Sequence, residues 1–255
     1  MSTLAESSLA MRSSTGDAAA ASRLEARLPP LLSVVAGMVD LTGFFTLGHV
    51  FTAHVTGNLV VAAAAAVDGG PLNTAQVLAI PVFMLAVAVV WLIARVSGRH
   101  GPSLARLLLW VHFLLLAAIL VFSVATTPSA DPHGTTAAIT VMIAVSAMAC
   151  QFALLRLAIP GAISTAVMTG NLTNAVLSSM DLLSRRAPLL QDDARRLKRS
   201  LQLLVGFLVG CIIAASTVAL LGDWTWSLPV ILSGLALAWA HPARKQIRSP
   251  RDESH

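Results

Sequence analysis

Charged residues are scarce in this chain, and their scarcity excludes an ordinary soluble domain. Only 11% of the 255 residues are Asp, Glu, Lys or Arg, whereas soluble domains average about 25%. Hydrophobic residues make up 56% of the chain, and the mean hydropathy is +0.78. The few charges cluster between long apolar runs, which indicates an all-α bundle that crosses a membrane several times.

The sequence also lacks the motifs of catalysis and of ligand coordination. It has no Gly-rich phosphate loop, no Ser-His-Asp spacing on a predicted loop and no paired external carboxylates, so we expect no enzyme activity and no cofactor. His49 and His54 are five residues apart without a Cys or carboxylate to complete a metal site, although an imidazole can relay protons. Cys150 and Cys211 both fall in apolar runs, so we expect buried free thiols.

Nucleic-acid binding is not expected despite the isoelectric point near 10.5. The positive charges lie at the edges of apolar runs and lack an aromatic face on which bases could stack. Anionic lipid headgroups are the expected partner, with the most basic segment at 184–200. That segment fits an amphipathic helix on the membrane surface or a solvated loop, and the sequence favours neither.

Residues 1–30 differ from the rest of the chain. They are rich in Ala and Ser, carry scattered charges and lack the apolar core of a cleavable signal peptide. We expect a polar cytosolic tail here. An organelle transit peptide is disfavoured by three acidic residues: Glu6, Asp17 and Glu25.

Four apolar segments have the composition of single membrane helices. Segments 73–94, 104–125 and 200–221 approach the roughly 20 residues that cross about 30 Å of hydrocarbon, and none contains an internal acid or lysine. Segment 224–240 is shorter and contains Pro229. Three residues bracket it as interfacial aromatics would: Trp224, Trp226 and Trp239.

Two further apolar stretches, 28–67 and 136–180, are too long for one helix. Either would extend about 60 Å as a straight rod, so each must break or fold back. Gly48 in the first stretch, and Pro160 with Gly161 at the equivalent place in the second, are the predicted break points.

The same tetrapeptide follows both predicted breaks, as Thr56-Gly57-Asn58-Leu59 and as Thr169-Gly170-Asn171-Leu172. With the same offset of 113 residues, ten of the 28 positions from 41 to 68 are identical to positions 154 to 181. This indicates an internal duplication. We therefore divide the chain into four parts: a tail at 1–30, membrane repeats at 31–126 and 136–240, and a basic tail at 241–255.

Charge distribution predicts the orientation in the membrane. Apart from Arg156, the Lys and Arg residues lie at or near the ends of the apolar runs in four groups: Arg12, Arg23 and Arg27; Arg95, Arg99 and Arg106; Arg185, Arg186, Arg195, Arg196, Lys198 and Arg199; and Arg244, Lys245, Arg248 and Arg251. The connectors 68–72, 127–135 and 222–223 carry no Lys or Arg. By the positive-inside rule we expect a plasma (inner) membrane protein with both termini in the cytoplasm and these connectors outside.

Two topologies are compatible with these segments. In the favoured one, each long stretch is one crossing plus a re-entrant piece, which gives six crossings in two inverted repeats. In the alternative, each long stretch is two full helices, which gives eight crossings in two parallel repeats. The alternative leaves the basic group from Arg95 to Arg106 outside, against the positive-inside rule.

Polar residues at membrane depth are the candidates for a functional site. Asp40 is the only acid inside an apolar stretch, where a carboxylate costs at least about 2.5 to 3.5 kcal/mol. Arg156 occupies the equivalent zone of the second repeat, so we hypothesise that it meets Asp40 as a charge pair or a protonation gate. An ion pair that only locks the repeats together is an equally good interpretation.

The two tetrapeptides are the second candidate. Thr56, Gly57 and Asn58, with Thr169, Gly170 and Asn171, would supply hydroxyls, amides and free backbone groups at two helix ends, with Thr as an N-cap. Such ends bind ions in transporters with broken helices. Tight helix packing by small residues is the alternative interpretation.

The sequence resembles the YoaK-like family of multipass bacterial membrane proteins, a domain of unknown function. The first signature is carried by residues 37–40, Phe44, Gly48 and 51–59, and the second by Gln151, Arg156 and 165–172. Cys150 and Phe152 replace the Gly and Asn expected beside Gln151, which bears on any polar network there. The resemblance implies a fold and a membrane location but no activity.

Two functions fit these observations. The first is a transporter of a small solute or ion, proton-coupled through Asp40, in which one repeat moves against the other. The second is a non-transporting membrane protein, such as a scaffold, an assembly factor or a stress-related factor. Asp40 should be reachable from water in a transporter and can stay buried in a scaffold.

Overall fold

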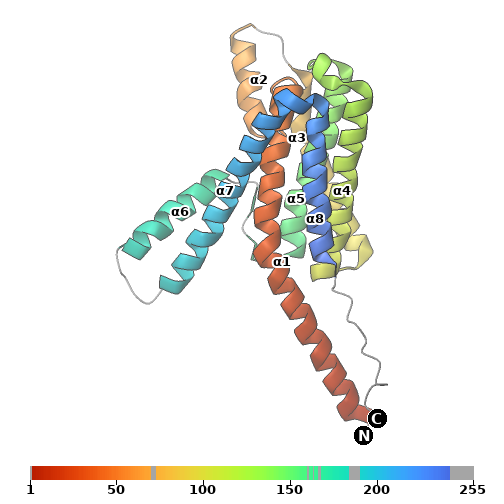
Figure 1. The fold of residues 1–255 in the computed structure, drawn as a ribbon, viewed down its shortest axis with the longest axis vertical. Coiled ribbons are helices and arrows are strands. Elements are labelled where there is room, and N and C mark those ends of the chain that lie inside the picture. Colours follow the sequence, from red (N-terminus) through yellow and green to blue (C-terminus); the bar gives the residue numbers. More distant parts are fainter. Residues whose placement is uncertain are drawn as a thin grey trace.

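The computed structural model describes residues 2–69, 73–159, 161–162, 164–165, 168–183 and 190–241, with side chains described from Leu24 onward except at 190–191. All regular elements in these ranges are helices (Figure 1). They are α1 (Ser2–Thr46), α2 (Gly57–Val67), α3 (Thr74–Ser97), α4 (Gly101–Thr126), α5 (Thr135–Ala158), α6 (Met168–Leu183), α7 (Leu190–Leu221) and α8 (Ser227–Ala240), with short 3₁₀ turns η1 (Pro128–Ala130) and η2 (Gly222–Trp226).

Within the described ranges, five segments are long and apolar enough to cross a membrane, which confirms the predicted membrane class. They are Leu24–Thr46, Thr74–Ser97, Gly101–Thr126, Thr135–Ala158 and Asp192–Ala240. The last contains most of α7 and all of α8, which run in opposite directions on either side of η2 (Figure 1).

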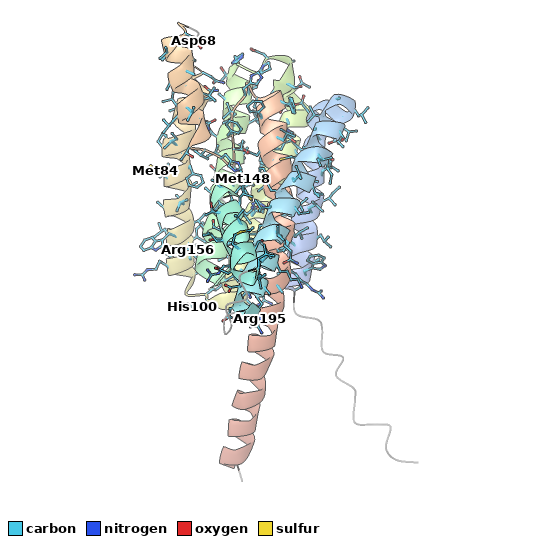
Figure 2. The ribbon with its side chains drawn as sticks, turned by 90° about the vertical axis from the view of Figure 1, so that its left-hand side faces the viewer. Asp68, Met84, His100, Met148, Arg156 and Arg195 are labelled. Carbon is cyan, nitrogen blue, oxygen red and sulfur yellow. The ribbon has the colours of Figure 1, made fainter. Side chains whose placement is uncertain are left out.

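The long helices alternate in direction through the bundle. In Figure 1, α1, α4 and α7 run from the lower to the upper end, and α3, α5 and α8 return. Figure 2 places Asp68 at the upper end, and His100, Arg156 and Arg195 toward the lower end. The basic ends of the helices therefore gather on one side of the bundle.

The helices pack in a small number of extensive pairs. α1 packs against α7, α3 and α4 pack against α5, and α8 packs against α4 and α1. Glycines permit the closest of these contacts, because a Cβ on Gly37 would meet the carbonyl oxygen of Phe207 and one on Gly210 would meet that of Val34. Small residues let membrane helices approach in this way, so α1 and α7 are held backbone to backbone.

Both long apolar stretches break where the sequence predicts. α1 ends at Thr46 and α2 begins at Gly57, with Gly48 between them at φ +73°. α5 ends at Ala158 and α6 begins at Met168, with Gly161 between them at φ +88°, while Pro160 lies outside the described residues. We call residues 47–56 the first loop and residues 159–167 the second loop.

The helices after these loops are too short to cross a bilayer upright. α2 has 11 residues and α6 has 16, which correspond to about 17 Å and about 24 Å against about 30 Å of hydrocarbon. α2 lies at the upper end of the bundle and α6 at the lower end (Figure 1).

Three details differ from the sequence-based expectations. The expected polar tail is part of a helix: α1 runs continuously from Ser2 into the bundle and includes Pro29 and Pro30. Trp226 is fully buried in the core rather than interfacial, whereas Trp224 and Trp239 are exposed. Within the basic segment, residues 190–200 belong to α7 and residues 184–189 lie outside the described residues.

Candidate functional site

Asp40 anchors the first loop. It lies on α1, six residues before the helix ends, and only 4% of its surface is exposed. Its Oδ1 accepts hydrogen bonds from the backbone N–H groups of Thr52 and Ala53, both at 2.7 Å. Because six helical residues span about 9 Å, these contacts require the chain to fold back by that distance after α1 ends. The first loop is therefore re-entrant with respect to α1.

The second oxygen of Asp40 is paired with His54. The Nδ1 of His54 lies 2.7 Å from Oδ2 of Asp40, and the His54 side chain is 33% exposed. His54 lies outside the candidate membrane spans. Its pKa is raised because Asp40 accepts this hydrogen bond and attracts the imidazolium, and these two effects outweigh the lowering of the pKa by partial burial. We call Asp40 and His54 the acid–imidazole pair.

Helix α7 closes one side of the acid–imidazole pair. The ring of Phe207 meets the ring of His54 edge to face, with centroids 5.0 Å apart. One turn further along, Cys211 Sγ lies 3.6 Å from the carbonyl oxygen of Gly37. Movement of α7 relative to α1 would therefore change the surroundings of the pair.

The start of α3 fixes the other end of the first loop. Asn73 Nδ2 donates to the carbonyl of Gly48 at 3.0 Å, and Gln76 Nε2 donates to that of His49 at 3.3 Å. Phe44 of α1 packs on Phe51, with ring centroids 5.0 Å apart. The loop is thus a defined structure rather than a loose connection.

Each tetrapeptide contributes an asparagine that holds its own loop. Asn58 accepts from the N–H of Phe51 and donates to its carbonyl, both at 2.8 Å. Asn171 donates to the carbonyl of Ser164 at 3.0 Å, which is the same seven-residue reach. Both asparagines are buried, at 0% and 3% exposure. We call this contact the asparagine clip.

The threonines of the tetrapeptides play a different part from the one expected. Thr56 occupies the N-cap position of α2, but its side chain makes no capping hydrogen bond, so the predicted capping role is wrong there. Thr56 and Thr169 are both exposed, and Gly57 and Gly170 are both partly buried. Within each tetrapeptide, only the asparagine side chain is buried in the protein.

On α5, the helix before the second loop, a neutral amide contacts the loop much as Asp40 contacts the first loop. Gln151 of α5 donates to the carbonyl of Leu32 at 2.9 Å and lies 3.5 Å from Thr165 Oγ1. Gln151 is fully buried and Thr165 is 1% exposed. Gln151 precedes the end of α5 by seven residues, so this loop also folds back, by about 10 Å.

The two loops do not form one joint cluster. The first loop contacts α1 at Asp40, whereas Gln151, the α5 residue beside the second loop, contacts α1 at Leu32, eight residues or about 12 Å away along the helix. Among the described residues, α6 packs extensively against α7 and α2 packs against α3, but α2 and α6 do not form a packed pair with each other.

The hypothesis that Asp40 meets Arg156 is wrong for the described residues. Asp40 is satisfied by loop amides and by His54, and no ion pair joins it to Arg156. Arg156 is exposed in the last turn of α5, toward the lower end of the bundle (Figure 2). Water solvates the guanidinium at that end, which avoids the desolvation cost of burying it beside Asp40.

Sequence reasoning missed the acid–imidazole pair. The available signal was a single membrane acid followed, beyond a predicted break, by a loop histidine. The buried His112 makes a structural contact, with Nδ1 3.0 Å from the carbonyl oxygen of Ala147. Among the described residues, no three His, Cys, Asp or Glu side chains come together as a metal site would require.

The antiparallel apolar helices define a multipass membrane protein. The chain belongs to the family described as "Protein of unknown function (DUF1275)", whose model matches residues 28–239. It is also similar to the "UPF0700 transmembrane protein YoaK" of Bacillus subtilis (strain 168), with 58% identity over 31 residues. That match covers 12% of this chain and only 14% of the relative. The resemblance seen in the sequence is confirmed, and no solved structure matches.

Proposed function

We propose that this protein transports a small solute or ion across the bacterial inner membrane, with proton movement through the acid–imidazole pair of Asp40 and His54. The observation that carries this proposal is the 2.7 Å contact between a buried membrane carboxylate and a partly exposed imidazole. Ionisable groups at this depth are costly and are functional by default.

The chemistry of the pair suits proton transfer. An imidazole takes up and releases protons near neutral pH, and here its ring is one hydrogen bond from a carboxylate. The carboxylate keeps two backbone amide partners in either state of His54, so protonation need not dismantle the loop. His54 is the group through which protons would reach Asp40, because it is the more exposed of the two.

Two inverted units, α1–α4 and α5–α8, would supply the moving parts. Three observations support this division. If the two units are exchanged, the helix pair α1–α7 becomes the pair α5–α3, and both pairs are extensively packed. The asparagine clip occurs in both units, and α2 and α6 lie at opposite ends of the bundle (Figure 1). Inverted units of this kind rock against each other in secondary transporters.

The same division gives a direction across the membrane. We propose that the lower end in Figures 1 and 2 is cytoplasmic, because it holds Arg156 and Arg195 while Asp68 lies at the other end. The first loop would then open toward the outside and the second toward the cytoplasm.

The test compares four versions of the protein in a strain that lacks it: wild type, Asp40→Asn, His54→Gln and His49→Asn. Untargeted profiling of small solutes and ions should show the same change with wild type and His49→Asn, and none with the other two. His49 is a matched control because it lies in the same loop at φ +59°, a conformation that Asn adopts readily.

The competing function is a rigid scaffold, in which the bonds from Asp40 to Thr52 and Ala53 serve only to hold the loop. A scaffold predicts that Asp40→Asn and His54→Gln keep the wild-type solute profile when present in the membrane at wild-type amounts. That result would contradict the transport proposal.

A further inference from the structure

A charged cavity lies between α1 and α7 at the lower end of the bundle. Its volume is about 250 Å³, and its charged lining consists of Glu25 from α1 with Arg195, Lys198 and Arg199 from α7. Arg199 is paired with Glu25 at 3.2 Å, and Arg195 approaches Asp192 only at 3.9 Å with both side chains largely exposed, which is a weak pairing. The cavity therefore keeps a net positive charge.

An apolar groove adjoins this cavity. Its volume is about 940 Å³, and the two hollows share Ala26, Pro30, Lys198 and Gln202. The groove is lined by aliphatic and aromatic side chains from α1, α6, α7 and α8: Leu31, Val34, Leu182, Leu201, Val205 and Trp239.

The charges lie at the lower end of the groove, and its upper part is lined by apolar side chains. Arg27 and Lys198 stand at the lower end, and seven residues further along each helix are Val34 and Val205. Seven helical residues correspond to about 10 Å, so the groove passes from cationic to apolar over that depth.

Only an amphipathic anion matches both parts. Free phosphate would use the cavity and leave the groove empty, and an uncharged acyl chain would leave the cations unmatched.

We propose that this place binds one anionic glycerophospholipid, with its phosphate at Arg195 and Lys198 and an acyl chain along α1 and α7 in the groove. Cationic pockets between membrane helices bind acidic lipid headgroups in this manner. The proposal is independent of transport, because it uses no residue of the acid–imidazole pair.

The experiment measures lipid binding to the purified full chain in neutral detergent by native mass spectrometry and by thermal melting. The probes are dioleoyl phosphatidylglycerol, dioleoyl phosphatidylcholine with the same acyl chains, and glycerol phosphate as the free headgroup. We expect saturable binding and a raised melting temperature with phosphatidylglycerol, at least about tenfold weaker binding of phosphatidylcholine, and no effect of glycerol phosphate. A response to glycerol phosphate equal to that of the lipid would overturn the proposal in favour of a free-phosphate site.

Three variants separate this site from general surface charge. The double variant Arg195→Gln/Lys198→Gln removes the cations, and Val205→Trp fills the groove without changing charge, since Val205 is 55% exposed. Both should weaken phosphatidylglycerol binding about tenfold or more. The control Arg95→Gln/Arg99→Gln removes equal charge from a separate cavity beside Trp91 and should leave binding unchanged. Equal weakening by the control, or no weakening by the first two, would refute the site.

Discussion

The two loops share a framework and differ in chemistry. Each follows a long helix, folds back by about 9 to 10 Å and is held by an asparagine clip. In the first loop the polar group on the preceding helix is the carboxylate of Asp40, paired with a histidine. In the second it is the neutral amide of Gln151, which contacts a hydroxyl and a carbonyl.

This difference separates structure from function. The shared clip explains how a helix can break inside the bundle without leaving the loop backbone unpaired, which the hydrocarbon environment would penalise. The charge in the first loop is not needed for folding back, because the second loop does so without one. The acid–imidazole pair is therefore the part of the framework that calls for a functional explanation.

Removing the carboxylate should have the largest effect on stability. Asp40→Ala leaves the amides of Thr52 and Ala53 and the imidazole of His54 without their acceptor, at a cost of about 3 to 5 kcal/mol. The equivalent change Gln151→Ala should cost about 1 to 3 kcal/mol, because only neutral bonds are lost. Unfolding in detergent by SDS titration measures both, and equal losses would abolish the distinction between the loops.

Enlarging a glycine at the contact of α1 and α7 should have the next largest effect on stability. Gly37→Ala or Gly210→Ala places a methyl group against a backbone carbonyl and should destabilise the protein by about 1 to 3 kcal/mol. Gly234→Ala is the control, since its methyl group would meet the Phe113 ring at an ordinary 3.4 Å. Unchanged melting temperatures for the first two would show that the helices are not held backbone to backbone.

The asparagine clips should be comparable in strength. Asn58→Ala and Asn171→Ala should each destabilise the protein by about 1 to 3 kcal/mol, because each removes a buried amide that is hydrogen-bonded to the backbone of its loop. The neighbouring changes Thr56→Ala and Thr169→Ala affect exposed side chains and should stay within about 0.5 kcal/mol. If only one of the two Asn→Ala variants is destabilised, the two loops do not share a framework.

The smallest expected effect is a shift in the titration of His54. With Asp40 present the pKa of His54 is raised from the ordinary value of a histidine, because the carboxylate accepts a hydrogen bond from the imidazolium and attracts its charge. Asp40→Asn removes that charge, so the midpoint of the imidazole ¹⁵N signals should move to lower pH. A midpoint that stays in place would mean that the pair is not formed in the membrane.

Much of the framework could be predicted from the sequence. The repeated tetrapeptide, Gly48 and Gly161 located both breaks, because glycine and membrane-depth asparagine are costly in an uninterrupted membrane helix. The partners of Asp40 could not be predicted, since they depend on how far the loop folds back. The count of charges at membrane depth predicts Arg156 as the partner, whereas the partners in the structure lie twelve to fourteen residues after Asp40 in the chain.

The most direct test of the inverted, re-entrant arrangement is the side of the membrane on which α2 and α6 end. In a variant without Cys150 and Cys211, single cysteines at Asp68 and Leu183 are labelled with a membrane-impermeant maleimide in intact cells and in inside-out vesicles. The account predicts that Asp68→Cys reacts only from outside and Leu183→Cys only from the cytoplasmic side. Reaction of both from the cytoplasmic side would instead establish eight crossings in parallel repeats and contradict the account.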